Sequence, residues 1–332
     1  MSWDFVGNSW AVKFLENSIA AGTSHQAYLI TGPDGIGKRT LAIRLAQRLL
    51  CVQPGDGPCR QCEPCRQIAE GQHPDFHRLE AEQIDGTLKV EAVREMQHQI
   101  ALAPYQAQRR VVLILRAHEL SQSAANALLK TLEEPPSQVV LILTARSEQS
   151  LLPTLVSRCE QITLRPVPPA RIIEELGPEL GTELASLLGA LSAGLPGIAF
   201  SLAKDEAALQ ARQNALKDLA SMLAADRIGR FAFAEELTKG RDLAASRRRV
   251  LDLLQVWLSF WRDVMLSSFG AEVDLANPDQ KHQIHSVAKQ ISKARSAEIV
   301  AKIEAVMTGV TQNANLQLSM ESLLLSLPKA GA

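Results

Sequence analysis

The stretch Ala27–Gln47 constrains the fold of this chain more than any other part of the sequence. A short apolar run is followed by a glycine-rich turn and then by helical periodicity, which is the order strand, phosphate-binding loop, helix. The spacing Gly32-x4-Gly37-Lys38 fits the P-loop pattern, in which backbone N–H groups and a helix N-terminus bind phosphate. With Gly35, these residues are the candidate nucleotide-binding set. The stretch predicts an α/β domain of the P-loop class.

The residues that handle metal and water in a P-loop ATPase are missing from this chain. A Ser or Thr should follow Lys38 to bind Mg²⁺, but Arg39 stands there. The strand Val111–Ile114 should end in two acids, one for Mg²⁺ and one for the attacking water, but Leu115 and Arg116 follow it. The two arginines also bring positive charge to the place of the metal ion. We therefore predict that the chain does not hydrolyse ATP by itself.

Nucleotide binding without hydrolysis stays open, because Lys38 and the loop backbone are retained. The alternative is that the glycines now only shape a turn. A separate functional hypothesis is an active ATPase with an atypical metal site. Mg²⁺-dependent turnover by the isolated chain would favour that hypothesis over a silent loop.

Strands and helices alternate over the first half of the chain, which predicts a largely parallel sheet. The runs Val111–Leu115 and Val139–Thr144 are apolar at nearly every position, as is typical of strands buried on both faces. Strands are expected at 27–30, 75–79, 111–115, 139–144 and 160–164, and helices within 3–21 and at 38–50, 90–102, 121–132 and 149–157.

A proline-rich hinge at 165–169 ends the strand pattern, and helical periodicity continues from there to Leu327. The change predicts three domains. They are an α/β P-loop domain over 1–166, a small helical lid over 167–205 and an all-α oligomerisation domain over 206–332.

Residues 51–65 interrupt the first domain and contain four cysteines, Cys51, Cys59, Cys62 and Cys65. Two successive Cys-x2-Cys steps let the chain wrap one ion, and a Pro/Gly-rich loop lets Cys51 approach as the fourth ligand. We predict tetrahedral Zn²⁺ in a structural role, because four thiolates leave no open position for water. The alternatives are an iron–sulfur cluster, His73 in place of Cys51, and four unbound thiols.

Bulk composition sets further limits on the class of protein. The net charge is −1 and aromatic residues make up 4% of the chain, so neither charge nor stacking residues indicate a nucleic-acid surface. Only Arg60 and Arg66 are basic between Cys51 and Gln72, which argues against a zinc module that binds nucleic acid directly. No apolar run reaches the ~18 residues of a membrane span, and the N-terminus lacks the pattern of a secretory signal, so we expect a cytoplasmic protein.

Two longer motifs resemble the AAA+ subunits of bacterial clamp loaders. Residues 123–136 read SAANALLKTLEEPP and residues 152–159 read LPTLVSRC, and both are very similar to signatures of that family. Four cysteines after the phosphate-loop helix are also typical of it, as are Gly7, Ser24-His25 and His73-Pro74-Asp75. The resemblance is strong over the first 200 residues and weaker in the helical tail.

The resemblance implies a rigid, non-hydrolysing wall of a hetero-pentameric ring in DNA polymerase III. That ring opens the sliding clamp and loads it on primed DNA. Motor subunits of the family keep the Ser or Thr and both acids, and this sequence does not. The implied partners are the motor subunits, a delta-like subunit, and the clamp and DNA through the complex.

The resemblance also implies roles for single residues. Arg158 of the Ser-Arg-Cys motif would reach the γ-phosphate of ATP on a neighbouring subunit, as an arginine finger. From the sequence alone, an Arg at a helix end is a solvated charge or a cap. Thr144 matches a sensor position, and Gly197 lies near the place where motor subunits carry a second sensing Arg. Arg94 would face DNA, with an ordinary surface arginine as the alternative.

Overall fold

The computed structural model describes residues 3–53, 55–83, 86–240, 242–271 and 274–329. The chain divides into two compact units. One contains Met1–Glu175 and Gly194–Ile198, and the other contains Leu176–Ala193 and Ala199–Ala332. A separate lid over 167–205 stays a prediction.

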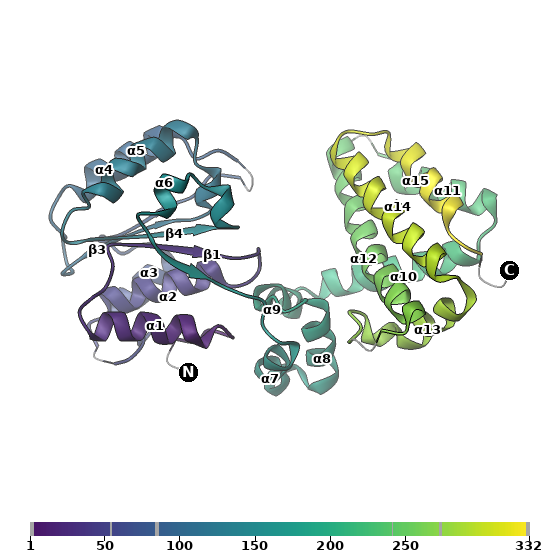
Figure 1. Ribbon diagram of the computed structural model, residues 1–332, viewed down its shortest axis with the longest axis horizontal. Helices are drawn as coiled ribbons and strands as arrows, with labels where there is room; N and C mark the ends of the chain where they lie inside the picture. Colours follow the sequence, from purple (N-terminus) through teal and green to yellow (C-terminus); the bar gives the residue numbers. More distant parts are fainter. Residues whose placement is uncertain (1–2, 54, 84–85, 241, 272–273, 330–332) are drawn as a thin grey trace. The chain divides into compact units, whose positions relative to one another are not determined.

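The first unit is a parallel sheet of five strands with helices on both faces, which confirms the predicted α/β class (Figure 1). The strand order is β2-β3-β4-β1-β5, and all neighbouring strands pair in parallel. The strands are β1 Ala27–Thr31, β2 Phe76–Leu79, β3 Arg110–Ile114, β4 Val139–Ala145 and β5 Glu160–Thr163. The helices are α1 Ser9–Ala20, α2 Lys38–Leu50, α3 Glu63–Glu70, α4 Val90–Ile100, α5 Gln122–Glu133 and α6 Pro153–Val156, with short 3₁₀ turns η1 Ala117–Glu119 and η2 Glu148–Ser150.

Successive side chains of β1 and β3 point to opposite faces of the sheet, and helices cover both faces. Tyr28 and Val111 pack toward α1, α2 and α3, whereas Leu29 and Val112 pack toward α4, α5 and α6 (Figure 1). Every residue of β1, β3 and β4 is buried. The carboxyl ends of these strands share one edge, which is where open α/β sheets bind ligands.

Two local predictions differ from the structure. The helix expected at 149–157 is instead the turn η2 followed by the single-turn helix α6. Pro153 explains the break, because it cannot donate to a preceding turn and restricts Leu152 to an extended backbone. The helix α3 was not predicted. It begins directly after Cys62, with a proline among its first residues, where proline is well tolerated.

A buried carboxylate organises the loop between α4 and β3. Asp75 is fully buried and accepts hydrogen bonds from the backbone N–H groups of Tyr105, Gln106 and Ala107, at 2.6–2.9 Å. The Arg110 guanidinium lies 3.4 Å from the same carboxylate. Although burial acts to raise it, these three N–H groups and Arg110 hold the pKa of Asp75 below its usual range.

We expect Asp75→Asn to lower the free energy of unfolding by about 3 kcal/mol at neutral pH, because it leaves Arg110 without its buried partner. The native pKa of Asp75 is lowered, so its contribution is present above the unfolded pKa of about 3.9 and is lost as the pH falls through the native value. The difference between wild type and variant should therefore shrink in acid. Urea unfolding at pH 7 and at pH 3 measures it, and an equal difference at both pH values would contradict the assignment.

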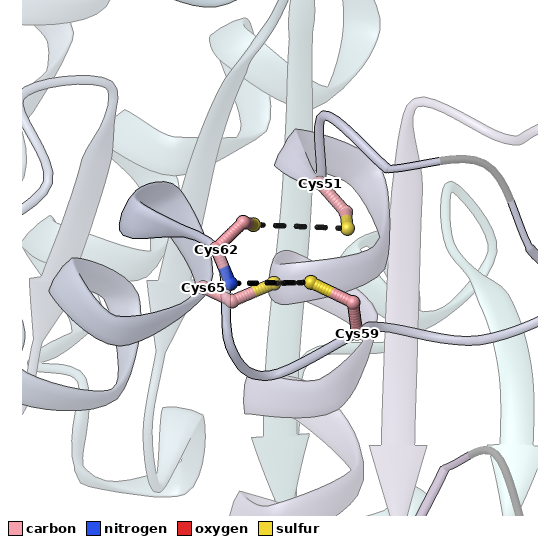
Figure 2. Close-up of side chains that lie close together, drawn as sticks. All are labelled: Cys51, Cys59, Cys62 and Cys65. Carbon is pink, nitrogen blue, oxygen red and sulfur yellow. Dashed lines mark hydrogen bonds between the residues drawn. The ribbon is translucent and has the colours of Figure 1, made fainter.

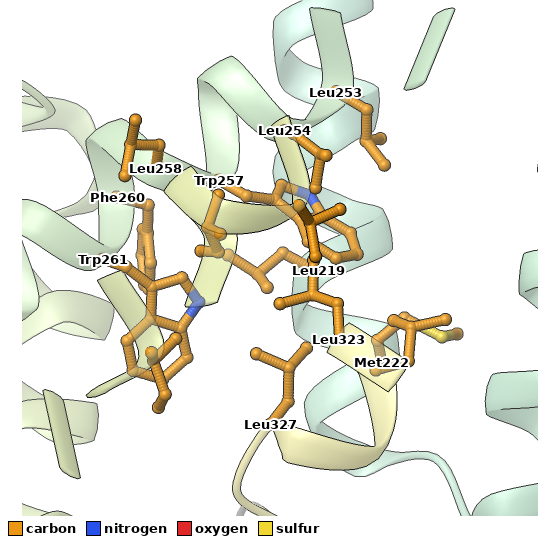
Figure 3. Packing of buried hydrophobic residues seen from close by; sticks show 14 of the residues in the cluster. Leu219, Met222, Leu253, Leu254, Trp257, Leu258, Phe260, Trp261, Leu323 and Leu327 are labelled. Atoms are coloured by element: carbon orange, nitrogen blue, oxygen red, sulfur yellow. The ribbon is translucent and has the colours of Figure 1, made fainter. Parts of the chain in front are cut away.

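The rest of the chain is helical, which confirms the predicted change of class. Helix α12 is 27 residues long and packs against α10, α13 and α14. Trp257 and Trp261 lie one turn apart on α12 and are fully buried among leucines of α10 and α15 (Figure 3). The elements are α7 Pro169–Leu180, α8 Thr182–Leu191, α9 Pro196–Lys204, α10 Glu206–Ala224, α11 Arg227–Thr238, α12 Leu243–Phe269, η3 Pro278–Gln280, α13 Lys281–Gln290, α14 Lys293–Thr311 and α15 Leu316–Ser326.

None of the helices in the described part of the chain combines the length and apolar character needed to cross a lipid bilayer.

Candidate functional site

The phosphate loop connects β1 to α2 in the predicted order of strand, loop and helix. Gly32, Gly35 and Gly37 all have positive φ angles, of 144°, 81° and 102°. At Gly32 a side chain is also excluded by space, since a Cβ atom would lie 2.8 Å from the carbonyl oxygen of Leu164. These glycines let the loop turn tightly from the sheet into α2, which begins at Lys38.

Lys38 is held by its own loop. Its Nζ donates to the carbonyl oxygens of Gly32 and Pro33 at 2.6 and 2.9 Å, and to Asp34 Oδ1 at 3.2 Å. Arg146, which follows β4, donates through Nε to Asp34 Oδ2 at 2.8 Å. Burial acts to raise the pKa of Asp34, but the hydrogen bonds from Arg146 and Lys38 keep that pKa below its usual value. The loop therefore contains an internal carboxylate between two cations.

An ion-pair cluster involves two of the three positions where a P-loop ATPase keeps its metal and water ligands, and the third position holds the buried Leu115. Arg39, in place of the Ser or Thr, and Arg116, in place of the water-activating acid, lie 3.7 and 3.5 Å from the carboxylate of Glu80. Arg78 Nε lies 3.3 Å from the same carboxylate. Arg116 also donates through Nε to both carboxylate oxygens of Glu119, at 2.8 Å each. Glu119 is thus an ion-pair partner of Arg116.

Glu80 is a further residue of this edge, beyond those predicted from the sequence. It follows the last residue of β2, and β2 pairs in parallel with β3, so both strands end at the edge of the sheet that carries the phosphate loop. An acid directly after a predicted strand is the signal that points to this edge.

The two sensor positions take part in backbone packing. Thr144 is buried, and its hydroxyl accepts the backbone N–H of Arg116 at 3.0 Å. Gly197 donates its N–H to the carbonyl oxygen of Gly35 at 2.7 Å, and a Cβ atom on Gly197 would lie 2.7 Å from that oxygen. Any side chain at Gly197 would therefore displace the phosphate loop.

Arg158 and Arg94 lie elsewhere in the first unit. Arg158 follows α6, and its Nη1 donates to the Thr154 carbonyl oxygen at 2.9 Å, while its Nη2 donates to Glu133 Oε1 at 2.6 Å. Its side chain is one-third exposed. Arg94 is exposed on α4, beside the buried Val93.

The four cysteines predicted to bind metal lie together (Figure 2). All four Sγ atoms fall within 4.8 Å of one another. The Sγ atoms of Cys51 and Cys62 are 3.9 Å apart, as are those of Cys59 and Cys65. Four thiolates about 2.3 Å from one zinc ion stand about 3.8 Å apart at the corners of a tetrahedron, so this cluster fits such an ion.

The surroundings favour the thiolate form at one of the thiols, Cys59. The backbone N–H of Cys62 donates to Cys59 Sγ at 3.3 Å and is the main reason that the pKa of Cys59 falls to about 6. Burial raises the pKa of Cys51 and of Cys65, and a bound divalent ion would reverse this by deprotonating both thiols. His73 is not in the cluster, because its Nδ1 accepts the backbone N–H of Asp75 at 3.1 Å.

The N-terminal segment joins the thiol cluster to the phosphate-loop helix, a link that the sequence did not reveal. Asp4 accepts hydrogen bonds from Arg44 of α2 and from Arg60, which lies between the cysteines. The indole of Trp3 donates to the carbonyl oxygen of Asp56 at 3.2 Å. On the other side, Phe5 packs so closely on the loop that a Cβ atom at Gly37 would lie 2.9 Å from its ring.

Family models and similar individual proteins both place the chain among DNA polymerase III subunits. The family model described as DNA polymerase III, delta subunit, matches residues 7–168, and the model for the C-terminal part of the delta subunit matches residues 206–329. The DNA polymerase III subunit delta' of Bacillus subtilis is 28% identical over 323 residues, which cover 95% of this chain and 94% of that relative. The subunit delta' of Escherichia coli is 40% identical over 191 residues, 57% of each chain.

Among solved structures, a DNA polymerase III gamma subunit-related protein from Thermotoga maritima aligns with a TM-score of 0.50 and 19% identity. The alignment covers 95% of this chain and 97% of that one, and it supports the fold. The matches of the two family models extend over both the α/β part and the helical part of the chain. The chain therefore belongs to the delta' family of DNA polymerase III clamp-loader subunits, which is related to AAA+ proteins.

Proposed function

We propose that the chain is a non-hydrolysing subunit of the clamp loader and that Arg158 acts in trans on ATP bound to a neighbouring motor subunit. The observation that carries this proposal is the ion-pair cluster at Glu80. Arg39 and Arg116 contact Glu80 where a motor subunit would bind Mg²⁺, so the chain's own loop lacks the metal chemistry of hydrolysis. Arg158 stands outside that cluster and is partly exposed.

The chemistry offered by Arg158 is charge stabilisation. A guanidinium is planar and permanently charged, and it can form two parallel hydrogen bonds to phosphate oxygens. Such a group stabilises the charge that develops on a transferred phosphoryl group. The decisive test is the DNA-stimulated ATPase of the reconstituted complex with Arg158→Ala, which should fall while assembly is kept.

The proposed assembly is a hetero-pentamer in the cytoplasm, with motor subunits and a delta-like subunit as neighbours. The complex as a whole would open the sliding clamp and load it on primed DNA. This chain would supply a rigid wall, which is consistent with a phosphate loop held on several sides by Lys38, Phe5 and Gly197.

In this proposal the phosphate loop has a structural role and takes no part in hydrolysis. An incoming phosphate would have to displace the Asp34 carboxylate from Lys38 and Arg146. A nucleotide bound there would meet no protein side chains of the kind that hold Mg²⁺ beside the γ-phosphate in a motor subunit.

We expect no Mg²⁺-dependent ATP hydrolysis from the isolated chain, and no change on Lys38→Ala, because the metal and the attacking water have no ligands. A phosphate-release assay measures both, with Lys13→Ala, an exposed lysine on α1, as a control for trace contamination. Turnover that Lys38→Ala abolishes and Lys13→Ala leaves unchanged would instead support an active ATPase with an atypical metal site.

The thiol cluster is proposed to hold one structural Zn²⁺ through Cys51, Cys59, Cys62 and Cys65. Zinc supplies a tetrahedral link between the end of α2 and the start of α3, and the four thiolates leave no position for water or substrate. Its effect would be on the shape of the insertion at 51–65 and on the N-terminal segment that contacts it.

A further inference from the structure

We propose that Glu133 is a positioning residue for Arg158, and that its carboxylate holds the guanidinium in the orientation in which it meets a phosphate on the neighbouring subunit. This inference rests on the trans role proposed above for Arg158. It assigns a role to an acid that lies on a different helix and outside the phosphate loop.

The local structure explains why Arg158 needs an external support. The residue follows α6, a helix of four residues in which only Leu155 is buried. One helical turn gives little control over a long side chain, and an unsupported Arg loses much rotamer freedom when it is fixed. One hydrogen bond, from Nη1 to the Thr154 carbonyl oxygen, comes from α6 itself.

The second hydrogen bond comes from a more rigid element. Glu133 is the last residue of α5, a helix of twelve residues that packs on the sheet through Leu128 and Leu132. Its Oε1 accepts from Arg158 Nη2 at 2.6 Å. Because α5 is anchored independently of α6, this contact fixes the guanidinium relative to the sheet.

The geometry of the contact leaves the guanidinium able to bind an anion. A guanidinium has five N–H donors, and over the described residues the side chain of Arg158 uses two of them. Glu133 binds one N–H of Nη2 through a single carboxylate oxygen, so the Nε–H and one N–H on each Nη remain for a phosphate. Glu133 therefore orients the guanidinium of Arg158 and leaves it N–H donors for a phosphate.

A purely structural explanation makes a different prediction. The basic side chain of Arg158 also neutralises an acid at the C-terminal end of α5, where negative charge is unfavourable. If that were the whole role of the pair, Glu133 would act on stability or assembly, and its effect would persist when Arg158 is absent. The neighbouring Glu134 makes no side-chain hydrogen bond or ion pair in the described structure and is a matched control.

The experiment measures DNA-stimulated ATP hydrolysis by the reconstituted complex as a function of ATP concentration. We expect Glu133→Ala to lower kcat by about three- to tenfold with little change in KM, since orientation is lost and ATP binding on the neighbour is not. Glu133→Gln should lie between Glu133→Ala and wild type, because the amide oxygen still accepts a hydrogen bond. Glu134→Ala should match wild type.

A double-mutant cycle with Arg158→Ala separates the explanations, with assembly of each complex checked by size exclusion. If Glu133 acts through Arg158, Glu133→Ala has no further effect in the Arg158→Ala complex. An additional loss there overturns the inference, as does a Glu133→Ala complex that matches Glu134→Ala or hydrolyses ATP faster than wild type. If Arg158→Ala itself hydrolyses ATP normally, the trans role fails and the positioning role fails with it.

Discussion

Replacing Arg158 with Ala is expected to lower ATP hydrolysis at the site it faces by about 10³-fold or more, the range over which arginine fingers act. In the proposed trans role the loss would concern the transition state, because the guanidinium would contact charge that develops as the phosphoryl group is transferred. It should appear in kcat of the reconstituted, DNA-stimulated complex. Arg158→Lys should rescue little, since an ammonium is a single point charge without the planar arrangement of donors.

The matched control for this prediction is Arg165→Ala, an exposed arginine a few residues further along the chain. Its complex should hydrolyse ATP at the wild-type rate. Native mass spectrometry should find the same set of subunits in the complexes of both variants. Normal hydrolysis by a complex that contains Arg158→Ala would show that Arg158 has no role in trans.

Removal of the metal is expected to have the largest effect on stability. A ligand that binds only the folded state stabilises it by about 4 kcal/mol when its free concentration is about 1,000 times Kd. For a unit of this size, each kcal/mol changes the midpoint of thermal unfolding by about 2–4 °C. A strong chelator should therefore lower that midpoint by about 8–16 °C, and metal analysis should find about one zinc per untreated chain.

Cysteine substitutions test whether this effect comes from the cluster. Cys62→Ser should reduce the zinc content and remove most of the chelator effect, because one of four thiolates is lost. Cys159→Ser is the matched control, since Cys159 lies outside the cluster and its burial raises the pKa to about 12. A metal-free chain that unfolds at the same temperature as the untreated one would refute a structural zinc site.

Structural features that depend on residues close together in the sequence could be predicted. The glycine spacing at Gly32 and Gly37 and the two Cys-x2-Cys steps were sufficient for the loop and for the thiol cluster. The buried runs in β3 and β4 were also predicted to within one residue, because their apolar character is continuous. In each case the residues that interact are close in sequence or share one element.

Features that depend on packing between distant elements could not be predicted. Glu80 meets Arg116 because β2 and β3 pair in parallel and end together, and it meets Arg39 because α2 begins near the same edge of the sheet. Glu133 meets Arg158 only because α5 and α6 lie against each other. The position of Glu80 after β2 signals its place at that edge of the sheet, but no local pattern pairs it with the arginines or pairs Glu133 with Arg158.

The cluster at Glu80 also bears on how such a protein changes over evolutionary time. Arg116→Glu alone would set a third carboxylate beside Glu80 and Glu119, which repel it. Arg39→Thr alone would introduce a hydroxyl while Arg116 still pairs with Glu80. Each arginine thus limits what a substitution of the other can achieve, so single substitutions are not expected to create an ATPase. Substitutions at 39 and 116 are therefore expected to be epistatic, because both side chains share the carboxylate of Glu80.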